Sequence, residues 1–423
     1  MVLVVGAGPA GATAARTLAQ AGVTVRLLDR SKFPRNKPCG GGISMRVLRR
    51  FPYLERELSR IATHKVARLF LEGPEGESTV VESDGPAALM IRRYEFDALL
   101  VSLAVEAGAE LVSEADIVQV ATDRSGVSLV ARDGRRFEAP VVVAADGVNS
   151  VIARRIGLNR GWPPSRVALD MMEETPRTSL RDVDPSTLWV AYGFDPEGPR
   201  GGAAPGRRGR ARAPEGYAYV FPKRDHVNVG IGYVLDHYRS AVGGRPYDLQ
   251  RDFVTHLRNR GVLAGESVEE NFTPFLIPVG GPLRRVGKGR VLLAGDAGGF
   301  VNGFTAEGIY YAMVSGDLAA RAVVNTTPGS ESSLARRYGR ACAREVGTEL
   351  RDSVLIQQYL FGSRRRIRRV IDGAGRRPAT TRLVLDFAMG RIPYSTLRRR
   401  LLTSAPTLAA HFVLERIRHV SRS

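Results

Sequence analysis

The stretch that decides the fold is Met1-Val2-Leu3-Val4-Val5-Gly6-Ala7-Gly8-Pro9-Ala10-Gly11, followed by a strand-like run that ends on Asp29. Residues 2–5 are apolar and mostly β-branched, which predicts a strand buried on both faces. Residues 12–21 are rich in Ala and Leu and predict a helix that Gly22 ends. A strand, a glycine turn, a helix and a second strand in this order predict a Rossmann-like βαβ unit.

The three glycines have separate physical roles. Gly6 permits the tight turn, Gly8 lets a pyrophosphate approach the backbone, and Gly11 lets helix and strand pack closely. The helix N-terminus offers free N–H groups to phosphates. Asp29, with Arg30 beside it, is placed to accept hydrogen bonds from an adenosine ribose. We interpret the stretch as a dinucleotide site; the alternative is an ordinary βαβ unit with glycine turns.

Length, charge and cysteine content set the outer bounds. A chain of 423 residues predicts two domains. The net charge of +19 favours nucleic acid, anionic lipid surfaces or acidic substrates, unless it only reflects a genome that uses Arg freely. Two cysteines, Cys39 and Cys342, indicate a reducing cytosol and no disulfide framework. With no signal peptide and no apolar run near the ~18 residues of a spanning helix, we expect a cytoplasmic protein whose membrane contact, if any, is peripheral.

A glycine-rich loop follows the first βαβ unit. Pro38-Cys39-Gly40-Gly41-Gly42 combines backbone freedom with little side-chain bulk, which suits close approach to a flat ligand. The alternative is a flexible linker. Residues 46–62 predict a helix, residues 65–84 short strands, and residues 92–107 a strong helix closed by Gly108. Arg93 at the start of that helix is either a cofactor contact or a surface arginine.

Two further strand–turn–helix motifs are aimed at a ligand. Residues 110–145 predict a β-meander whose last strand ends in Asp146-Gly147, with a helix from Val151. Residues 290–294 predict a buried strand that turns at Gly295-Asp296. An acid at a strand end among small residues can bind a polyol hydroxyl, and the N–H groups near Gly308 can bind another oxygen at a helix start.

The region 160–280 is dominated by alternating strands. Residues 195–215 hold five arginines and predict a solvated loop, in which an anion-binding role is the weaker reading. Residues 217–223 place Tyr217, Tyr219 and Phe221 on one strand face. Gly230 and Gly232 lie on the expected partner strand and would leave open space, so this face lines either a slot for a long apolar ligand or a core. From residue 331 the chain is helical and Arg-rich, which suits an anionic membrane or a solvated tail.

The three motifs together resemble the monooxygenase-like flavoprotein superfamily, with its GxGxxG, DG and GD motifs at Gly6–Gly11, Asp146-Gly147 and Gly295-Asp296. Within it the chain is most similar to the geranylgeranyl reductase family. The specific matches are Pro38–Gly42, Arg93-x-x-Phe96-Asp97, and Tyr217–Lys223 followed by Asn228-Val-Gly230. Two positions depart: Tyr219 stands where the family usually has Trp, and Ala306 opens the family's Gly-Glu-Gly-Ile. These departures leave the cofactor prediction unchanged.

The resemblance implies non-covalently bound FAD and reduction of isolated double bonds in a polyprenyl chain on a lipid, quinone or diphosphate. It implies an aromatic face of Tyr217, Tyr219 and Phe221 over the flavin ring, with Pro222 and Gly230 also at the substrate. Cys39 and Tyr219 are the candidate catalytic residues, Cys39 as a proton source unless its role is structural; no metal ligand is predicted. The predicted cofactor contacts are Gly6, Gly8, Ala10, Gly11, Asp29, Arg30, Cys39, Gly40, Gly42, Arg93, Val118, Asp146, Gly295, Asp296, Gly308 and Ile309.

The expected fold class is α/β: a Rossmann-like FAD domain with a β-meander, and an α+β substrate domain with an antiparallel sheet and a helical C-terminal region. We expect the FAD domain at 1–157 and 285–330, the substrate domain at 158–284 with help from 60–90, and the basic helical region at 331–423. The electron donor is NADPH or reduced ferredoxin, since no second GxGxxG unit is present, and the positive charge suits an acidic electron-transfer protein or a membrane. Nucleic acid is not expected.

Two alternatives to the reductase remain. The first is a monooxygenase that hydroxylates or epoxidises an apolar substrate on the same core. The second is a non-catalytic lipid-binding flavoprotein. A halogenase is the weakest reading, because the chain has no Trp-x-Trp-x-Ile-Pro sequence.

Overall fold

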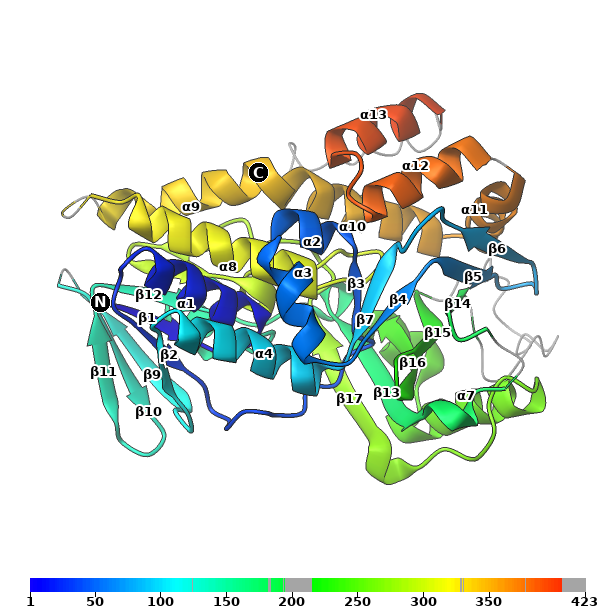
Figure 1. The fold of residues 1–423 in the computed structure, drawn as a ribbon, viewed down its shortest axis with the longest axis horizontal. Helices are drawn as coiled ribbons and strands as arrows, with labels where there is room; N and C mark the ends of the chain where they lie inside the picture. Colours follow the sequence, from blue (N-terminus) through cyan, green and yellow to red (C-terminus); the bar gives the residue numbers. More distant parts are fainter. Residues whose placement is uncertain are drawn as a thin grey trace. The chain divides into compact units, whose positions relative to one another are not determined.

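The computed structural model describes residues 1–404 apart from 124, 182–183, 193, 195–214, 328, 330 and 377. The arginine-rich loop predicted at 195–215 therefore lies almost wholly outside the described residues. The chain divides into two compact units. Figure 1 shows the chain coloured from blue to red along the sequence. Unit 1 comprises residues 1–37, 93–167 and 277–354, and unit 2 comprises residues 38–92, 168–276 and 355–423.

Unit 1 is built on a six-stranded sheet in the order β18-β19-β12-β1-β2-β8. Strand β1 pairs in parallel with β2 on one side and with β12 on the other, and β12 pairs in parallel with β19. All four residues of β1 and of β12 are buried, as expected for parallel strands covered on both faces. The strands are β1 (Val2–Val5), β2 (Val25–Leu28), β8 (Glu110–Val112), β12 (Val141–Ala144), β18 (Gly287–Lys288) and β19 (Val291–Leu293).

The helices of unit 1 pack on this sheet and on one another. Gly316 lies so close to Ala10 that a side chain there would overlap the Ala10 backbone, so α1 and α8 cross in close contact. Figure 1 shows α1, α4 and α8 side by side. The helices are α1 (Pro9–Gln20), α4 (Arg93–Glu106), α5 (Val151–Arg155), α8 (Ile309–Val324), α9 (Leu334–Cys342) and α10 (Thr348–Phe361), which continues into unit 2.

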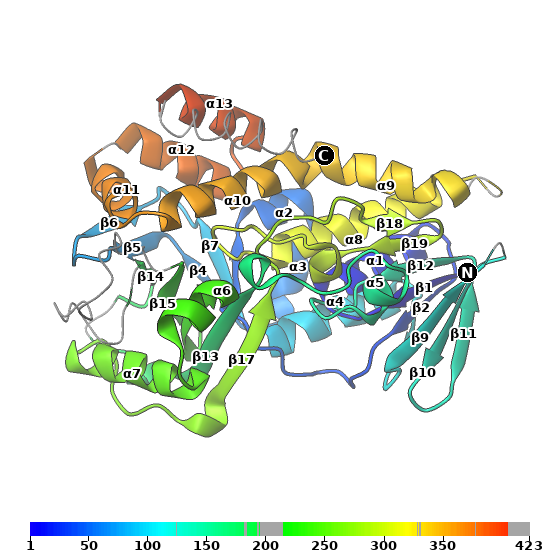
Figure 2. The same ribbon diagram turned by 180° about the vertical axis from the view of Figure 1, so that it is seen from behind.

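The β-meander is shorter than the sequence predicts. It contains only β9 (Ile117–Thr122), β10 (Val127–Ala131) and β11 (Arg136–Ala139), which form a separate antiparallel sheet visible in Figure 2. The outer strands of the predicted meander, β8 and β12, instead pair in parallel with β2 and β1. Local alternation indicates strands here but not their partners, because parallel pairing joins residues far apart in the chain.

Unit 2 is built on a seven-stranded sheet in the order β17-β13-β16-β15-β14-β5-β6. The expectation of an antiparallel sheet needs one correction, since β14 pairs with β5 in parallel. Residues 68–82 join this sheet, and α7 (Pro246–Asn259) packs on it. The strands are β5 (Arg68–Glu72), β6 (Ser78–Glu82), β13 (Ala168–Pro176), β14 (Thr187–Tyr192), β15 (Gly216–Pro222), β16 (His226–Val234) and β17 (Phe272–Ile277).

The rest of unit 2 is a small sheet and several helices. The small sheet has the order β3-β7-β4, and the predicted helix over 46–62 is broken at Pro52 into two short helices. Figure 1 shows α11 beside β5 and β6. The elements are β3 (Gly42–Ser44), β4 (Thr63–Val66), β7 (Ala88–Ile91), α2 (Arg46–Arg50), α3 (Tyr53–Glu57), α6 (Leu235–His237), α11 (Arg364–Arg376), α12 (Pro378–Ala388) and α13 (Tyr394–Ser404).

The two compact units have different boundaries from the expected domains: residues 158–167 and 277–284, expected in the substrate domain, belong to unit 1. Residues 38–59, which include the glycine-rich loop, are expected in the FAD domain but belong to unit 2. The basic C-terminal region is not one body, because residues 331–354 belong to unit 1 and the rest to unit 2.

Candidate active site

The glycine turn of unit 1 has the geometry that its spacing predicts. Gly6 has a φ of 93°, and a side chain there or at Gly11 would overlap the backbone of Ala145 or of Gly6 respectively. The space over Gly8 is different: the nearest atom to an added Cβ is Arg35 Nη2, at 3.6 Å. Helix α1 begins directly after Gly8 with no side-chain cap, so its first N–H groups remain available to an anion.

Asp29 closes the same turn. Its Oδ2 accepts a hydrogen bond from Ala7 N at 2.6 Å, and its Oδ1 accepts one from Ser31 N at 2.8 Å. The buried carboxylate therefore fixes the loop after β1 to the end of β2. Each carboxylate oxygen has a second lone pair, so the predicted ribose contact stays a prediction. The neighbouring Arg30 is exposed.

A cluster of two arginines and one carboxylate lies beside Gly8. Arg93 donates from Nε and Nη2 to Asp97 at 2.6 and 2.7 Å, and Asp97 is fully buried. Arg35 Nη2 lies 3.1 Å from Asp97 Oδ2, while the buried Arg35 Nη1 has no hydrogen-bond partner among the described residues. The Arg35 guanidinium therefore has one hydrogen-bond donor without a partner in the described part of the chain, and it lies next to the turn at Gly8. This donor set fits a pyrophosphate.

Arg35 is a functional candidate that the sequence does not single out. It is one of many arginines and lies in a loop with no motif of its own. The predicted contact Arg93 lies close by, since both arginines bind Asp97. Only the folded chain shows that the Arg35 guanidinium stands over Gly8.

The Gly295-Asp296 turn meets the first helix. Gly295 has a φ of 60°, and a Cβ there would lie 3.0 Å from Ala10 Cβ. Asp296 is partly buried; burial raises the pKa of its carboxyl, and the charges of Lys37 and Arg93 act in the opposite direction. A Cβ on Gly308 would lie 3.6 Å from Asp296 Oδ1, so the predicted contacts Ala10, Gly295, Asp296 and Gly308 come together.

Helix α8 begins after a strained residue. Gly308 precedes its first residue, Ile309, and supplies no side-chain cap. Ala306 has a φ of 55°, in the left-handed region that glycine favours. This conformation explains why a glycine suits this position, and it makes the alanine a source of strain.

The Asp146-Gly147 turn caps a short helix. Asp146 Oδ1 accepts a hydrogen bond from Ser150 Oγ at 2.6 Å, and its Oδ2 accepts one from Ile152 N at 3.2 Å. Burial raises the pKa of Asp146. The carboxylate thus holds the start of α5, which is a structural role. Val118 lies on β9 of the meander and is partly buried.

Unit 2 contributes an aromatic strand packed on the glycine-rich loop. Tyr217, Tyr219 and Phe221 share one face of β15, with successive ring centroids 6.2 and 4.6 Å apart. A Cβ on Gly40 would lie 3.0 Å from Phe221 Cδ2 and 3.5 Å from Tyr219 Cε2. The predicted substrate strand and the predicted Cys39–Gly42 contact loop therefore form one surface.

The expected open space over Gly230 is not there. Tyr219 pairs with Gly230 across the strands, and its ring lies over that glycine: a Cβ on Gly230 would fall 2.8 Å from Tyr219 Cε1 and closer still to Cζ. The ring reaches across because its hydroxyl donates to Asp170 Oδ2 at 3.2 Å. The missing side chain makes room for Tyr219 and not for a ligand. Burial raises the pKa of Tyr219 well above its usual value, so the phenol stays protonated.

Cys39 lies in the loop beneath this strand and is partly exposed. Its backbone N–H donates to Met172 Sδ at 3.1 Å, and its Sγ accepts from Gly41 N at 3.3 Å. The residue is partly exposed and its sulfur is held within the loop, which is compatible with the predicted role as a proton source.

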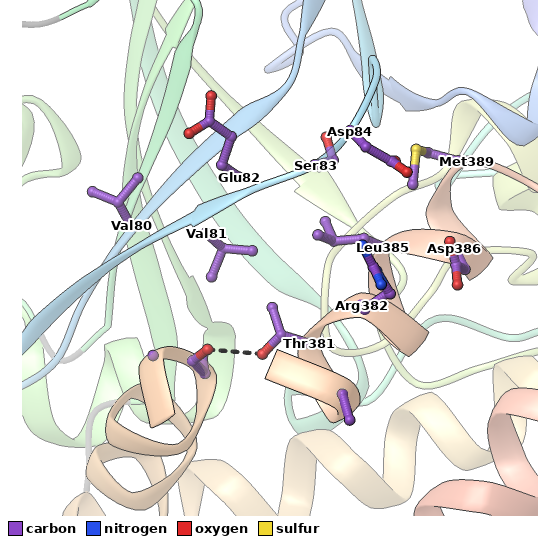
Figure 3. A pocket seen from close by; sticks show the side chains of 13 residues that line it. Val80, Val81, Glu82, Ser83, Asp84, Thr381, Arg382, Leu385, Asp386 and Met389 are labelled. Atoms are coloured by element: carbon purple, nitrogen blue, oxygen red, sulfur yellow. Dashed lines mark hydrogen bonds between the residues drawn. The ribbon is translucent and has the colours of Figure 1, made fainter. Parts of the chain in front are cut away.

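A separate cavity of about 520 Å³ lies between β6 and the helices α11 and α12 of unit 2. In Figure 3 Val81, Leu385 and Met389 stand around it, and Thr381 Oγ1 donates to Ala374 O at 2.8 Å. None of the predicted site residues lines it. Across the described ranges, no group of metal-ligating side chains is present. Within the same part of the chain, no helix has the length and hydropathy to cross a bilayer.

Residues 1–224 match the family of FAD binding domains. This result, with the glycine turn, the acid at Asp29 and the orphaned donor of Arg35, defines the class: the chain is an FAD-dependent oxidoreductase. It is 32% identical to digeranylgeranylglycerophospholipid reductase 1 of Methanopyrus kandleri, over 82% of this chain and 90% of that protein. It is 31% identical to menaquinone reductase of Mycobacterium tuberculosis, over 80% of each chain. The chain belongs to the geranylgeranyl reductase family of flavoproteins.

Solved structures carry the same fold. A geranylgeranyl bacteriochlorophyll reductase-like protein of Thermoplasma acidophilum superposes with a TM-score of 0.76 at 21% identity, covering 95% of this chain and 98% of that one. The flavin-dependent brominase Bmp2 superposes with a TM-score of 0.70 at 16% identity, covering 96% and 99%. These likenesses confirm the fold class predicted from the sequence.

Proposed function

We propose that this protein saturates isolated double bonds of a polyprenyl chain carried on a lipid, quinone or diphosphate. The observation that carries the proposal is the aromatic strand Tyr217, Tyr219 and Phe221 packed on the glycine-rich loop at Gly40. A row of rings beside residues without side chains offers a flat apolar surface to an extended hydrocarbon. The same loop holds the partly exposed residue Cys39.

The substrate class is supported by the names of relatives. Besides the phospholipid and menaquinone reductases, the chain is 31% identical to geranylgeranyl diphosphate reductase of Oryza sativa, over 80% of this chain and 70% of that protein. Two of these three relatives are named for a geranylgeranyl substrate, one a glycerophospholipid and the other a diphosphate. We therefore place recognition on the hydrocarbon and leave the head group open.

Unit 1 holds the cofactor in this proposal. Arg35 and the free N–H groups of α1 would hold the pyrophosphate, Asp29 the adenosine ribose, and Asp296 a hydroxyl. When bound and reduced, FAD supplies the hydride, which is chemistry that no side chain offers. An isolated alkene has no carbonyl to hold charge, so the protein's part is to orient the chain and exclude water.

The second hydrogen arrives as a proton. Cys39 is the group we assign to hold it, because the residue is partly exposed and lies in the loop that packs against the aromatic strand at Gly40. Tyr219 is buried, and its hydroxyl donates to Asp170. We therefore assign Tyr219 the role of shaping the aromatic surface, not that of proton donor.

Electron delivery and location follow from charge. NADPH or a reduced ferredoxin supplies the electrons, and a net charge of +19 suits an acidic partner.

Arg365, Arg369 and Arg376 are exposed and share one face of α11, which suits the anionic inner face of a membrane. Sedimentation with phosphatidylglycerol vesicles tests this placement: replacing the three arginines by Ala should abolish binding, and unchanged binding would contradict it.

The function is tested in an anaerobic cuvette. The bound flavin is reduced with dithionite, excess reductant is removed, and a geranylgeranyl diphosphate or phospholipid is added. We expect the yellow absorbance to return with formation of a hydrogenated product. A monooxygenase would instead leave the flavin reduced until oxygen is admitted and then consume oxygen in step with substrate. A non-catalytic lipid carrier would bind the substrate without any change in flavin absorbance.

A further inference from the structure

Three successive carbonyl groups of the glycine-rich loop are each held by a separate donor. Asn228 Nδ2 donates to Cys39 O at 2.9 Å, Lys223 Nζ donates to Gly40 O, and Ile91 N donates to Gly41 O at 2.9 Å. Two of these donors are side chains from the β15–β16 hairpin. A loop with three glycines has no side chains of its own to fix it, so its conformation depends on these donors.

Lys223 is an unusual donor because its ammonium group is buried. The residue is 3% exposed, and its ammonium forms no ion pair with a carboxylate among the described residues. A Cβ on Gly41 would lie 3.0 Å from Lys223 Nζ, so the loop passes directly over the ammonium group. Burying an amine without a counter-ion is costly, and a bond to a neutral carbonyl does not offset that cost. A hydrocarbon side chain of similar length would fill the space at lower cost.

Asn228 is equally buried, at 1% exposed. Its amide nitrogen is used on Cys39 O, and its Oδ1 has no hydrogen-bond partner in the described part of the chain. The side chain thus leaves one acceptor unsatisfied while it holds the Cys39 carbonyl. Both buried polar side chains lower the stability of the folded protein where they contact the loop. Locally destabilising residues of this kind are typical of functional sites.

We propose that Lys223 and Asn228 are positioning residues that hold the Cys39–Gly41 backbone and so place the Cys39 thiol for double-bond reduction. This proposal rests on the proposed function for its catalytic consequence. Its structural part, the dependence of Cys39 on both side chains, stands on the hydrogen bonds alone.

The charge of Lys223 gives the proposal a pH signature. Burial lowers the pKa of Lys223 to about 7, against smaller opposing effects of Cys39 and Glu174. Below that pH the donor to Gly40 O is a charged ammonium group, and above it a neutral amine that forms a weaker hydrogen bond. Other charged groups near the turn include His226, which lies 3.7 Å from Glu174, Arg92, which is paired with Glu174, and Arg177, which donates to Lys223 O. Arg224 and Asp225 lie in the turn itself, 4.0 Å apart. Burial lowers the pKa of His226 to about 4, so His226 is neutral throughout this range.

The test measures iodoacetamide alkylation of Cys39 in the oxidised holoenzyme, relative to a free thiol, as pH is varied. Cys342 serves as an internal reference, because burial raises its pKa to about 12. The wild-type relative rate should show a step near pH 7, where the donor to Gly40 O loses its charge. Lys223→Met should abolish that step, whereas Asn228→Leu should retain it because the ammonium group remains. A step that persists in Lys223→Met overturns the role of Lys223.

Turnover supplies the second readout. Each variant should lower kcat by roughly 10- to 100-fold with little change in KM, as expected when a group is misplaced and substrate binding is kept. Lys288→Met is the matched control: Lys288 also donates to a backbone carbonyl, Ile156 O at 2.9 Å, and its loss should change neither readout. If Lys223→Met does not fold, as judged by circular dichroism, the kcat of Asn228→Leu decides the outcome: a normal kcat would contradict the proposal.

The two readouts separate this inference from the proposed function. A protein that reduces no prenyl chain, yet loses its alkylation step in Lys223→Met, keeps the positioning of Cys39 and refutes the reductase. A protein that reduces prenyl chains with normal kcat in both variants refutes the positioning and keeps the reductase.

Discussion

The ring of Tyr219 lies over Gly230 on the neighbouring strand, so closely that a Cβ on Gly230 would fall 2.8 Å from Tyr219 Cε1. The ring can take this position only because Gly230 has no side chain. The Tyr219 hydroxyl donates to Asp170 on β13, the strand beyond β16. One small residue therefore sets the shape of the aromatic surface on which the proposed substrate lies.

Replacing Gly230 with Ala tests that relationship. The added methyl group must displace the Tyr219 ring, and overpacking of this kind costs about 1–3 kcal/mol. We expect urea denaturation of the apoprotein to show a loss in that range. Gly232→Ala is the control on the same strand, since its Cβ would meet Asp170 Oδ1 at 3.4 Å, an ordinary contact. Equal losses in the two variants would contradict the account of Tyr219.

Arg35 should contribute to FAD affinity. Its orphaned Nη1 and its position over Gly8 suit a pyrophosphate, and a hydrogen bond to a charged group contributes about 1.5–3 kcal/mol. Arg35→Met should therefore weaken FAD binding roughly 10- to 100-fold, measured by fluorescence titration of the apoprotein. Arg132→Met removes an exposed ion pair with Asp116 in the same unit and should leave FAD affinity unchanged. Wild-type affinity in Arg35→Met would remove Arg35 from the site.

Asp296 should make the apoprotein less stable as pH rises. Its folded pKa is raised above the unfolded value near 3.8, so its favourable contribution is complete below that value and is lost as pH rises through the folded pKa. Asp296→Asn should stabilise the apoprotein at neutral pH while weakening FAD binding. Thermal melts across the acid-to-neutral range measure the first effect.

Asp133 provides a control of opposite sign. Its side chain is exposed, and its hydrogen bonds with Arg135 lower its pKa, so Asp133→Asn should give no stabilisation at neutral pH. If Asp296→Asn likewise gives no stabilisation, burial of the Asp296 carboxylate does not destabilise the folded protein at neutral pH, which would contradict our inference.

Ala306 offers a gain in stability. A left-handed conformation costs a non-glycine residue about 1–2 kcal/mol, against about 0.5–1 kcal/mol for the extra chain entropy of glycine. Ala306→Gly should therefore raise the free energy of unfolding by about 0.5–1 kcal/mol. Glu114, with a φ of 59°, is the other described non-glycine residue with positive φ, and Glu114→Gly should give a similar gain. A gain at Glu114 alone would show that the surrounding loop compensates the strain at Ala306.

The sequence predicts the parts of this structure that depend on backbone chemistry. The spacing of the first glycines assigns Gly6 to a tight turn and Gly11 to close packing of helix and strand, and the geometry agrees. The order of the three motifs also predicts the fold class. Both results rest on short local patterns, in which residue type and backbone conformation are directly linked.

The parts that the sequence does not predict depend on side chains from distant segments. Alternation along β15 and β16 indicates a glycine opposite Tyr219 but not that the ring fills the space. Nothing local marks Arg35 among the arginines, or shows that Lys223 and Asn228 reach the loop nearly two hundred residues earlier. Strands β8 and β12 are placed in the meander for the same reason, since their partners are non-local.

The central claim is that two hydrogen atoms are added to an isolated prenyl double bond and that no oxygen is added. Mass spectrometry of the product from a single anaerobic turnover of the reduced holoenzyme tests it most directly. We expect the substrate mass to rise by two hydrogen atoms for each flavin oxidised, with the product missing when the flavin is left oxidised. Unchanged substrate under these conditions, or a product that needs oxygen and gains an oxygen atom, would contradict the assignment.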